Sequence, residues 1–236
     1  MEIPKIVIFH TSHTAGTYFR TNIESYYNTD EVAFLYKQKW VEYDFYSMEE
    51  IKNSKNDYKF ICGHISSEYL YDDYFKDFVK IVNFREPFSN ARSNYFYHVR
   101  NMTLGLKPGF NDIDLQLKQF SGHYFRYLFG PKYYIDTISD ASVGKCFYDT
   151  IPLLNLVIKD FTSVDYIVEN NNIDKFLIFF QQKFSISEKR QKIIFKNANK
   201  FPEKEVYFNE YEDYFFDVLP KAFEMYLKLV DQQKWL

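Results

Sequence analysis

The chain has 236 residues, of which 46% are hydrophobic and 26% are charged, a composition that is ordinary for a globular protein. Its length predicts one domain over residues 1–236 with a substantial core. The formal net charge of −3 excludes the bulk positive field of many nucleic-acid-binding proteins, so we expect no nucleic-acid partner.

The cysteines and the apolar runs restrict where the protein works. Cys62 and Cys146 form neither a metal-binding spacing nor a disulfide framework. No apolar run approaches the ~18 residues of a membrane span, and the first apolar run is too short for a signal peptide. We therefore expect a cytoplasmic protein with no membrane partner.

The first predicted element is a strand of four apolar residues, Ile6 to Phe9, which lacks the polar alternation of a half-exposed strand. A small polar loop follows from His10 to Gly16, and Thr17 opens an amphipathic helix. Amides at a helix N-terminus lack helical partners and favour anions, and Gly16 lets the backbone approach a phosphate closely. The Walker A pattern is absent. The turn is therefore either an anion site or a tight strand–helix turn without a ligand.

Strands and helices are predicted in alternation along the rest of the chain. Strands are expected at Val32 to Tyr36, Tyr58 to Ile65, Lys80 to Phe84 and Leu153 to Lys159. Helices are expected at Met48 to Asn53, Phe88 to Met102, Asp112 to Phe129, Thr162 to Asn170, Ile173 to Phe184 and Tyr211 to Asp231, with a short helix or turn at Ser67 to Phe78. This alternation predicts an α/β fold, a three-layer sandwich with a mainly parallel central sheet.

Three segments in the first half of the chain carry distinctive motifs. Residues 9–17 read F-H-T-S-H-T-A-G-T, residues 60–64 read F-I-C-G-H, and residues 82–95 read V-N-F-R-E-P-F-S-N-A-R-S-N-Y. The first resembles the F-H-I-P-K-T-[GA]-G-T loop of sulfotransferases, which grips the 5′-phosphosulfate of the donor PAPS (3′-phosphoadenosine 5′-phosphosulfate). The third resembles their L-R-D-P-x-x-R-x-x-S-x-Y segment, which binds the 3′-phosphate. The second resembles the G-H strand end of the carbohydrate branch, the heparan-sulfate 2-O-sulfotransferase type.

The resemblance implies a P-loop-like sulfotransferase fold and an enzyme that transfers a sulfuryl group from PAPS to an acceptor hydroxyl. A carbohydrate is the favoured acceptor, PAP is the product, and no metal is required. The implied donor-binding residues are His13, Thr14, Ala15, Gly16, Thr17, Arg85 and Ser93. Arg85 suits a phosphate because its planar guanidinium can donate two parallel hydrogen bonds. His64 is the implied catalytic base, since an imidazole with a pKa near ~6.5 accepts a proton at neutral pH.

Each of these residues also has a plainer interpretation. Arg85 could belong to an ion pair and Ser93 to a helix face, and Thr17 could simply cap a helix. His64 could be a strand-end histidine bonded to a backbone carbonyl. His10 ends the first predicted strand, where a structural role is favoured over chemistry.

His13 is the main departure from the family motif, because it stands where the family has a lysine that supplies a permanent cation. We expect the dianionic phosphate beside it to raise the pKa of His13, so that His13 acts as the catalytic donor to the leaving group. The alternative is a catalytically weak or inactive relative that binds PAP or PAPS. A small-molecule kinase is disfavoured, because the chain has no Walker lysine and no convincing Mg²⁺-binding acidic residue after a strand. These motifs leave the acceptor and the oligomeric state open.

Overall fold

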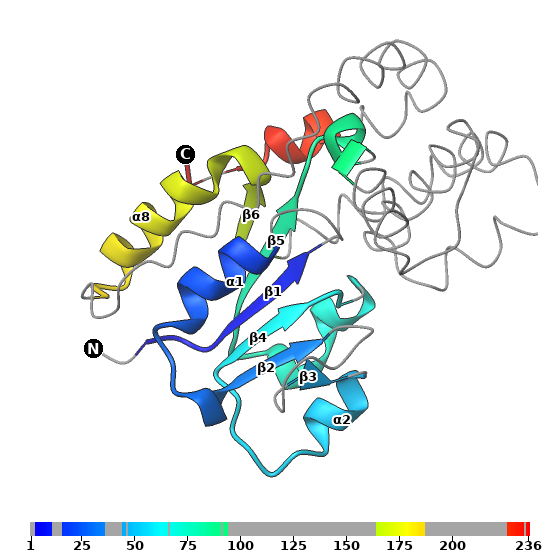
Figure 1. The fold of residues 1–236 in the computed structure, drawn as a ribbon, viewed down its shortest axis with the longest axis vertical. Coiled ribbons are helices and arrows are strands. Elements are labelled where there is room, and N and C mark those ends of the chain that lie inside the picture. The colour runs from blue at the N-terminus through cyan, green and yellow to red at the C-terminus, as the bar shows by residue number, and fades with distance from the viewer. Residues whose placement is uncertain are drawn as a thin grey trace, which may run out of the picture.

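The structure, a computed structural model, describes residues 3–10, 16–35, 44–45, 47–65, 67–90, 92–93, 164–186, 226–233 and 235–236 (Figure 1). The helix predicted at Asp112 to Phe129, the strand predicted at Leu153 to Lys159 and Cys146 lie outside the described residues. The helices predicted at Phe88 to Met102 and at Tyr211 to Asp231 are described only in part. Their described residues are helical at 87–90, 92–93 and 226–230.

A sheet of six strands, all paired in parallel, forms the centre of the described structure. The strands are β1 (Ile6–His10), β2 (Val32–Leu35), β3 (Asp44–Phe45), β4 (Phe60–Gly63), β5 (Val79–Phe84) and β6 (Tyr166–Glu169). Their order across the sheet is β3-β2-β4-β1-β5-β6. Parallel neighbours require crossover connections, so the prediction of an α/β fold with a parallel sheet is confirmed.

β1 lies between β4 and β5, at the point where the chain changes direction across the sheet (Figure 1). From β1 the chain continues to β2 on one side, whereas the next described strand after β5 is β6 on the other side. In open parallel sheets, ligands bind outside the carboxyl ends of the strands at such a switch point. The topology therefore places the expected ligand site at the carboxyl ends of β1 and its two neighbours.

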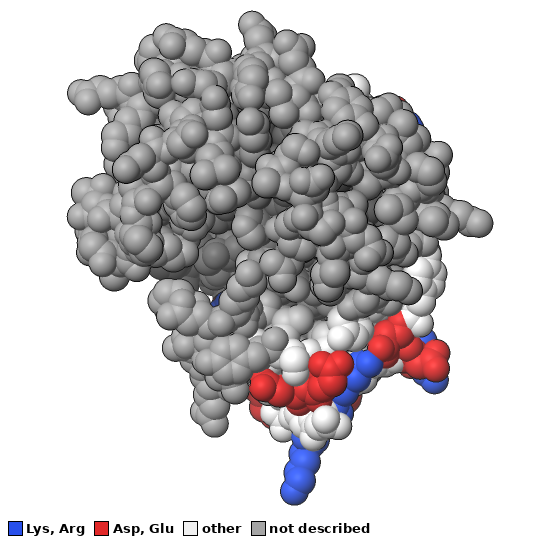
Figure 2. Space-filling view, turned by 90° about the vertical axis from the view of Figure 1, so that its right-hand side faces the viewer, with Lys and Arg blue, Asp and Glu red and all other residues white. Residues whose placement is uncertain are grey.

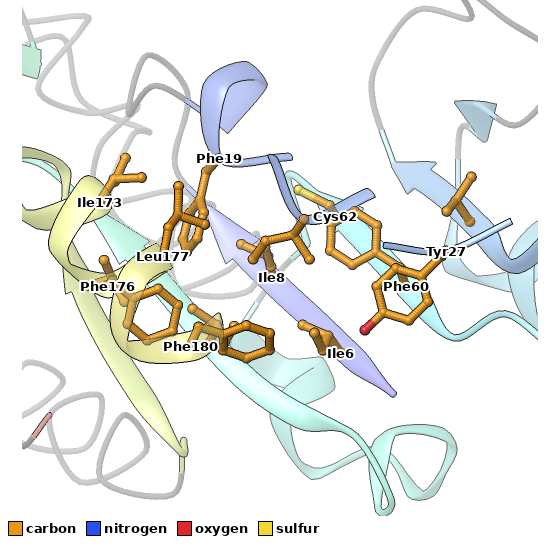
Figure 3. Packing of buried hydrophobic residues seen from close by; sticks show 14 of the residues in the cluster. Ile6, Ile8, Phe19, Tyr27, Phe60, Cys62, Ile173, Phe176, Leu177 and Phe180 are labelled. Carbon is orange, nitrogen blue, oxygen red and sulfur yellow. The ribbon is translucent and has the colours of Figure 1, made fainter. Parts of the chain in front are cut away.

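Two helices, α1 (Gly16–Glu24) and α8 (Ile173–Lys183), cover one face of the sheet. Their contact is aromatic, with the ring centroids of Phe19 and Phe176 5.6 Å apart. Figure 3 shows how these side chains meet the strand residues beneath them. The buried cluster that results contains Ile6, Ile8, Phe19, Ile23, Tyr27, Val32, Phe34, Phe60, Cys62, Ile81, Val168, Ile173, Phe176, Leu177 and Phe180.

Two hydrogen bonds also tie α1 and the turn after it to α8. The Tyr18 hydroxyl donates to Asp174 Oδ1 at 2.5 Å, and Gln181 Nε2 donates to the Tyr26 hydroxyl at 2.5 Å. Burial and the bond to Asp174 raise the pKa of Tyr18 to about 12. These bonds fix α1 against α8. They therefore also help to position Gly16, the first residue of α1, beside His10 at the carboxyl end of β1.

Short helical segments cover the opposite face of the sheet. They are α2 (Met48–Lys52) and the 3₁₀ helices Ser67–Tyr71 and Asp73–Phe75, and a further 3₁₀ helix, Thr29–Glu31, precedes β2. On this face the ring of Phe9, from β1, meets the ring of Phe75 at 5.9 Å between centroids. Both faces of β1 are therefore buried, as its unbroken apolar run predicts.

The helix predicted from Thr162 to Asn170 is wrong. Residues Tyr166–Glu169 form β6, which pairs in parallel with β5. Ile167 and Val168 are buried there, and β-branched residues favour a buried pleated surface. A 3₁₀ helix at Asn170–Asn172 then leads directly into α8.

Other predicted elements within the described residues are confirmed, with small shifts at their ends. They are the strands β1, β2, β4 and β5, the helices α2 and α8, and the turn region from Ser67 to Phe78. α1 begins at Gly16, one residue before the predicted start at Thr17, and it ends at Glu24. The two-residue strand β3 was not predicted.

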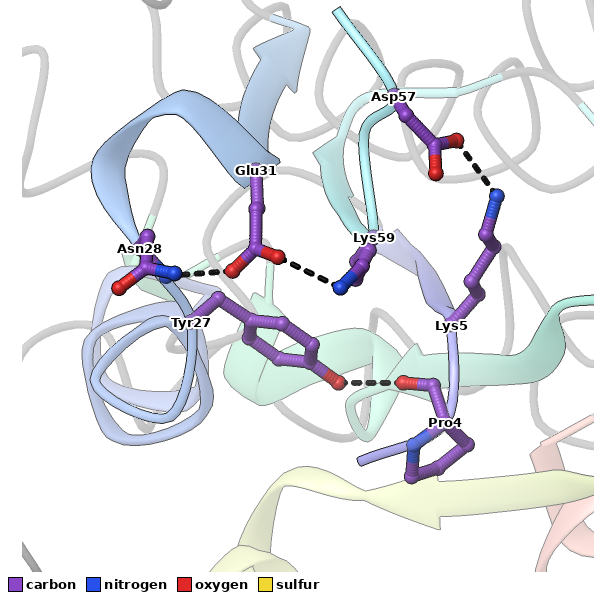
Figure 4. A network of polar contacts seen from close by, with 7 residues as sticks. All are labelled: Pro4, Lys5, Tyr27, Asn28, Glu31, Asp57 and Lys59. Carbon is purple, nitrogen blue, oxygen red and sulfur yellow. Dashed lines mark hydrogen bonds and ion pairs between the residues drawn. The ribbon is translucent and has the colours of Figure 1, made fainter. Parts of the chain in front are cut away.

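The amino-terminal end of the sheet is held by paired charges (Figure 4). Lys5 Nζ lies 2.6 Å from Asp57 Oδ1, and Lys59 Nζ lies 2.7 Å from Glu31 Oε1. Hydrogen bonds to these lysines lower the pKa values of the Asp57 and Glu31 carboxyl groups. Positive and negative charge therefore neutralise one another at this end.

The described part of the face in Figure 2 carries Asp and Glu side chains next to Lys and Arg side chains. This mixture agrees with the small net charge of the whole chain. Among the described residues, no helix combines the length and the apolar character that crossing a membrane requires.

Candidate functional site

Two predicted site residues, His64 and Arg85, and the structural candidate His10 stand at the carboxyl ends of neighbouring strands. His10 is the last residue of β1, His64 directly follows β4, and Arg85 directly follows β5. The imidazole rings of His10 and His64 are in contact, with centroids 4.9 Å apart and planes at 74°. The parallel pairing of β1 with β4 and β5 thus gathers residues from separate parts of the sequence at the topological switch point.

The face of the sheet that α1 covers changes from apolar to polar at this end. His10 comes two residues after Ile8, and His64 comes two residues after Cys62, both members of the buried cluster. Side chains two apart in a strand share a face, and the His64 amide still donates to the Leu35 carbonyl of β2 at 3.0 Å. The two imidazoles therefore continue the core rows of β1 and β4 and lie toward α1.

Asn83 extends this polar row into β5. It follows Ile81 by two residues, and its Cα pairs with that of His10. Its side chain is fully buried, and its Nδ2 donates to the Val168 carbonyl of β6 at 3.1 Å, which fixes the orientation of the amide. Within the part of the chain that the structure describes, the buried Oδ1 of Asn83 has no hydrogen-bond partner. The sequence did not predict Asn83 as a site residue, because the local sequence does not show that this strand residue pairs with His10.

The position of the His10 ring requires a glycine at position 16. α1 begins at this glycine, and a Cβ added there would lie only 2.4 Å from His10 Cε1 and 2.7 Å from Nδ1. Any larger residue would force the imidazole or the helix to move. The sequence assigns Gly16 to the approach of a phosphate, whereas in the structure the imidazole of His10 occupies the space that a side chain at this position would need.

The predicted donor loop is described only at its end. His13, Thr14 and Ala15 lie outside the described residues, so their predicted roles stay predictions. Gly16 and Thr17 form the first turn of α1, in which Thr17 is exposed and no acidic residue occurs. Positive potential from the α1 dipole is therefore not neutralised by a carboxylate in its own first turn.

Glu86 caps the helical residues that follow β5. Its Oε1 accepts a hydrogen bond from the Phe88 amide at 2.8 Å, and its Oε2 accepts one from the Ser89 amide at 2.6 Å. The Asn90 amide donates to the Glu86 carbonyl at 2.9 Å and closes the first turn. This cap uses both oxygens of the carboxylate that adjoins Arg85 in sequence.

Arg85 lies half-buried in a positive environment. Burial and the nearby charge of Arg92 lower the pKa of Arg85, and the effect of Arg92 is larger than the opposite effect of Glu86. Ser93, the predicted hydroxyl partner of Arg85, adjoins Arg92 in the helical segment and is half-buried. Two guanidinium groups close enough to repel one another are the arrangement that an anion such as a phosphate would stabilise.

A buried carboxylate at the end of β6 is a feature that the sequence did not predict. Glu169 Oε1 accepts hydrogen bonds from the Tyr226 hydroxyl at 2.8 Å and from Asn171 Nδ2 at 3.1 Å, and the Glu169 amide donates to Gln233 Oε1 at 3.0 Å. Burial and Glu169 raise the pKa of Tyr226. The ring of Tyr226 also contacts that of Phe84, in β5, so the C-terminal segment packs beside the strand that leads into Arg85.

No cluster of three or more His, Cys, Asp or Glu side chains suited to a metal ion occurs among the described residues. The described residues of the site include cationic side chains, two imidazoles and the buried amide of Asn83. A scan of the chain against models of known protein families finds no match, and a search of curated proteins also finds none.

Proposed function

We propose that this protein is a PAPS-dependent sulfotransferase with a P-loop-like sulfotransferase fold, which transfers a sulfuryl group to an acceptor hydroxyl, with a carbohydrate as the favoured acceptor. The observation that carries the proposal is the pairing of β1 with β5, in which His10 is opposite Asn83. The loop predicted to hold the 5′ end of PAPS leaves β1, and Arg85 leaves β5. Two anions of one nucleotide could therefore bind at neighbouring strand ends.

The 3′-phosphate is assigned to the second of these strand ends. Arg85 would hold it through its guanidinium, Arg92 would add positive charge, and Ser93 would add a hydroxyl. The mutual repulsion of Arg85 and Arg92 supports this assignment, because a bound dianion would remove it.

The 5′ end of PAPS is assigned to residues 13–17, which comprise the end of the loop before α1 and the first two residues of α1. There, backbone amides, the hydroxyls of Thr14 and Thr17 and the cation of His13 would hold the charge that develops on the leaving phosphate. The oxygen of the acceptor hydroxyl would bond to sulfur while the bond from sulfur to the 5′-phosphate oxygen breaks. His64 would accept the proton that the acceptor hydroxyl loses in this step. PAP and the sulfated acceptor would then leave.

A nucleotide-binding assay tests the proposal most directly. We expect PAP to raise the melting temperature of the protein and ATP to leave it unchanged. AMP, which lacks the 3′-phosphate, should stabilise much less than PAP, and Arg85→Met should remove that difference. Equal stabilisation by ATP, or none by PAP, would overturn the proposal.

A catalytically weak or inactive PAP-binding protein is the second candidate, favoured by His13 in place of the family lysine. Turnover of labelled PAPS with a panel of glycans separates it from an active enzyme. An active enzyme should lose rate as pH rises and His13 becomes neutral, and His13→Lys should retain that rate. Binding of PAP without turnover at any pH would favour the second candidate.

A further inference from the structure

The contact between His10 and His64 joins two histidines that the sequence treats separately. Their ring centroids are 4.9 Å apart and their planes meet at 74°, so one ring presents its edge to the face of the other. Only 6% of His10 is exposed, and the Nδ1 atom of His64 is buried. His10 is therefore buried, and its ring meets the half-buried His64 at the edge of the core.

His10 is held on several sides. Its backbone lies in β1, between β4 and β5, where its Cα pairs with that of Asn83. Its ring lies against Gly16, so close that a Cβ at that position would meet three of its atoms within 2.8 Å. α1 is in turn tied to α8. The His10 ring consequently has little freedom to change rotamer.

His64 is held by its backbone on one side and by the His10 ring on another. Its amide donates to the Leu35 carbonyl at 3.0 Å, and Gly63 before it lies so close to β2 that a Cβ there would be 2.2 Å from the Leu35 oxygen. Gly63 therefore fixes where the chain of His64 leaves the sheet. The His10 ring packs against the His64 imidazole.

We propose that His10 is a positioning residue, whose buried ring holds the imidazole of His64 in the orientation needed to accept a proton from the acceptor. This inference rests on the proposed function, in which His64 is the base. His10 itself touches no substrate in this proposal, and it acts through ring packing. A catalytic group displaced by about 1 Å can lose on the order of 100-fold in rate, so such support matters to the reaction.

A pair of substitutions tests the role of the ring. We expect His10→Ala to lower kcat by about 10- to 100-fold, while the KM for PAPS and the Kd for PAP change less than about twofold. His10→Phe keeps an aromatic ring beside His64 and should recover most of the lost kcat. Ile8→Val, two residues earlier on the same face of β1, is the matched control and should leave kcat unchanged. An unchanged kcat in His10→Ala, or no recovery in His10→Phe, would overturn the inference.

The NMR signals of the His64 ring give a readout that does not depend on activity. The His64 signals are those that disappear from the spectrum in His64→Gln. The ring of His10 should shift these signals in the wild type. His10→Ala should move these signals, whereas Ile8→Val should not. Signals that stay in place in His10→Ala would overturn the inference even if the protein transfers sulfuryl groups. Signals that move in a protein that neither binds PAP nor turns over PAPS would overturn the proposed function and leave the ring contact standing.

Discussion

Charged side chains are arranged differently at the two ends of the central sheet. At the amino-terminal end, Lys5 and Lys59 each lie within 2.7 Å of a carboxylate, and the pKa values of those carboxyl groups are lowered. At the carboxyl end, Arg85 lies near Arg92, and this like charge helps to lower the pKa of Arg85. The first arrangement pairs opposite charges, whereas the second places like charges near one another at the end of the sheet where we propose that the phosphate binds.

The largest expected effect is a loss of affinity for PAP when the charge of Arg85, at the carboxyl end of the sheet, is removed. Arg85→Met keeps the aliphatic stem but removes the charge, and we expect the affinity for PAP to fall about 10- to 100-fold, as for the loss of a charged hydrogen bond worth about 1.5–3 kcal/mol. The free energy of unfolding without ligand should stay the same or rise, because a half-buried cation beside Arg92 is gone. Titration calorimetry with PAP and urea unfolding measure the two quantities.

Lys59→Met is the matched control for Arg85→Met at the other end of the sheet. It removes a cation that is paired with Glu31, so it should weaken the fold slightly and leave the affinity for PAP unchanged. If both variants lost the same affinity, or if Arg85→Met unfolded more readily than Lys59→Met, the contrast between the two ends would be wrong.

A steric test sharpens the geometry of the carboxyl end. In Gly16→Ala the new Cβ would lie 2.4 Å from His10 Cε1, and we expect the free energy of unfolding to fall by about 1–3 kcal/mol through overpacking. If the imidazole is the obstacle, adding His10→Ala should recover part of this loss in a double-mutant cycle. Losses that simply add in urea unfolding would show that another neighbour of Gly16 is responsible.

A third variant tests the buried carboxylate beside the site. Tyr226→Phe removes the hydroxyl that donates to Glu169 at 2.8 Å, and we expect a loss of about 1 kcal/mol in the free energy of unfolding. Tyr18→Phe makes the same change beside Asp174, whose side chain is exposed, and should lose about half as much. An equal or larger loss for Tyr18→Phe in urea unfolding would mean that burial of Glu169 does not strengthen its bond.

The same two tyrosines predict a dependence of stability on high pH. A hydroxyl whose pKa is raised in the folded state contributes stability that is complete below the ordinary pKa of 10.0 and is lost as pH rises through the raised value. For Tyr18 the loss should occur between pH 10.0 and about 12. Unfolding of the wild type and of Tyr18→Phe at stepped pH should therefore converge over this interval.

The sequence predicts those parts of the fold that depend on local pattern. The run Ile6 to Phe9 indicates a strand buried on both faces, and the structure buries it between α1 and the 3₁₀ helices. β6 was mistaken for a helix because its four residues, Tyr166–Glu169, are too few to show a period. Its strand character comes from pairing with β5, which a local pattern does not contain.

In the candidate site, too, single residues could be predicted from the sequence, whereas contacts between them could not. The resemblance to sulfotransferase motifs singles out His64 and Arg85 one by one. The contact of His10 with His64 results from the register that aligns Phe9 with Gly63, and the bond of Tyr226 to Glu169 joins residues 57 positions apart. Such contacts depend on strand order and on packing, so they could not be predicted from the spacing of residues.

The smallest expected effect lies at the amino-terminal end and completes the contrast. Glu31→Gln removes the charge that Lys59 approaches, and because this pair is still partly exposed to solvent we expect a loss of only about 0.2–1 kcal/mol in the free energy of unfolding. The pKa of Glu31 is lowered from its ordinary 4.5, chiefly by the hydrogen bond from Lys59, so this stability is present above pH 4.5 and is lost as pH falls through the lowered value. Unfolding of the wild type and of Glu31→Gln should therefore differ at pH 7 and low salt, and the difference should shrink in 1 M salt or in acid. A difference that persisted in acid would show that the ion pair is not its cause.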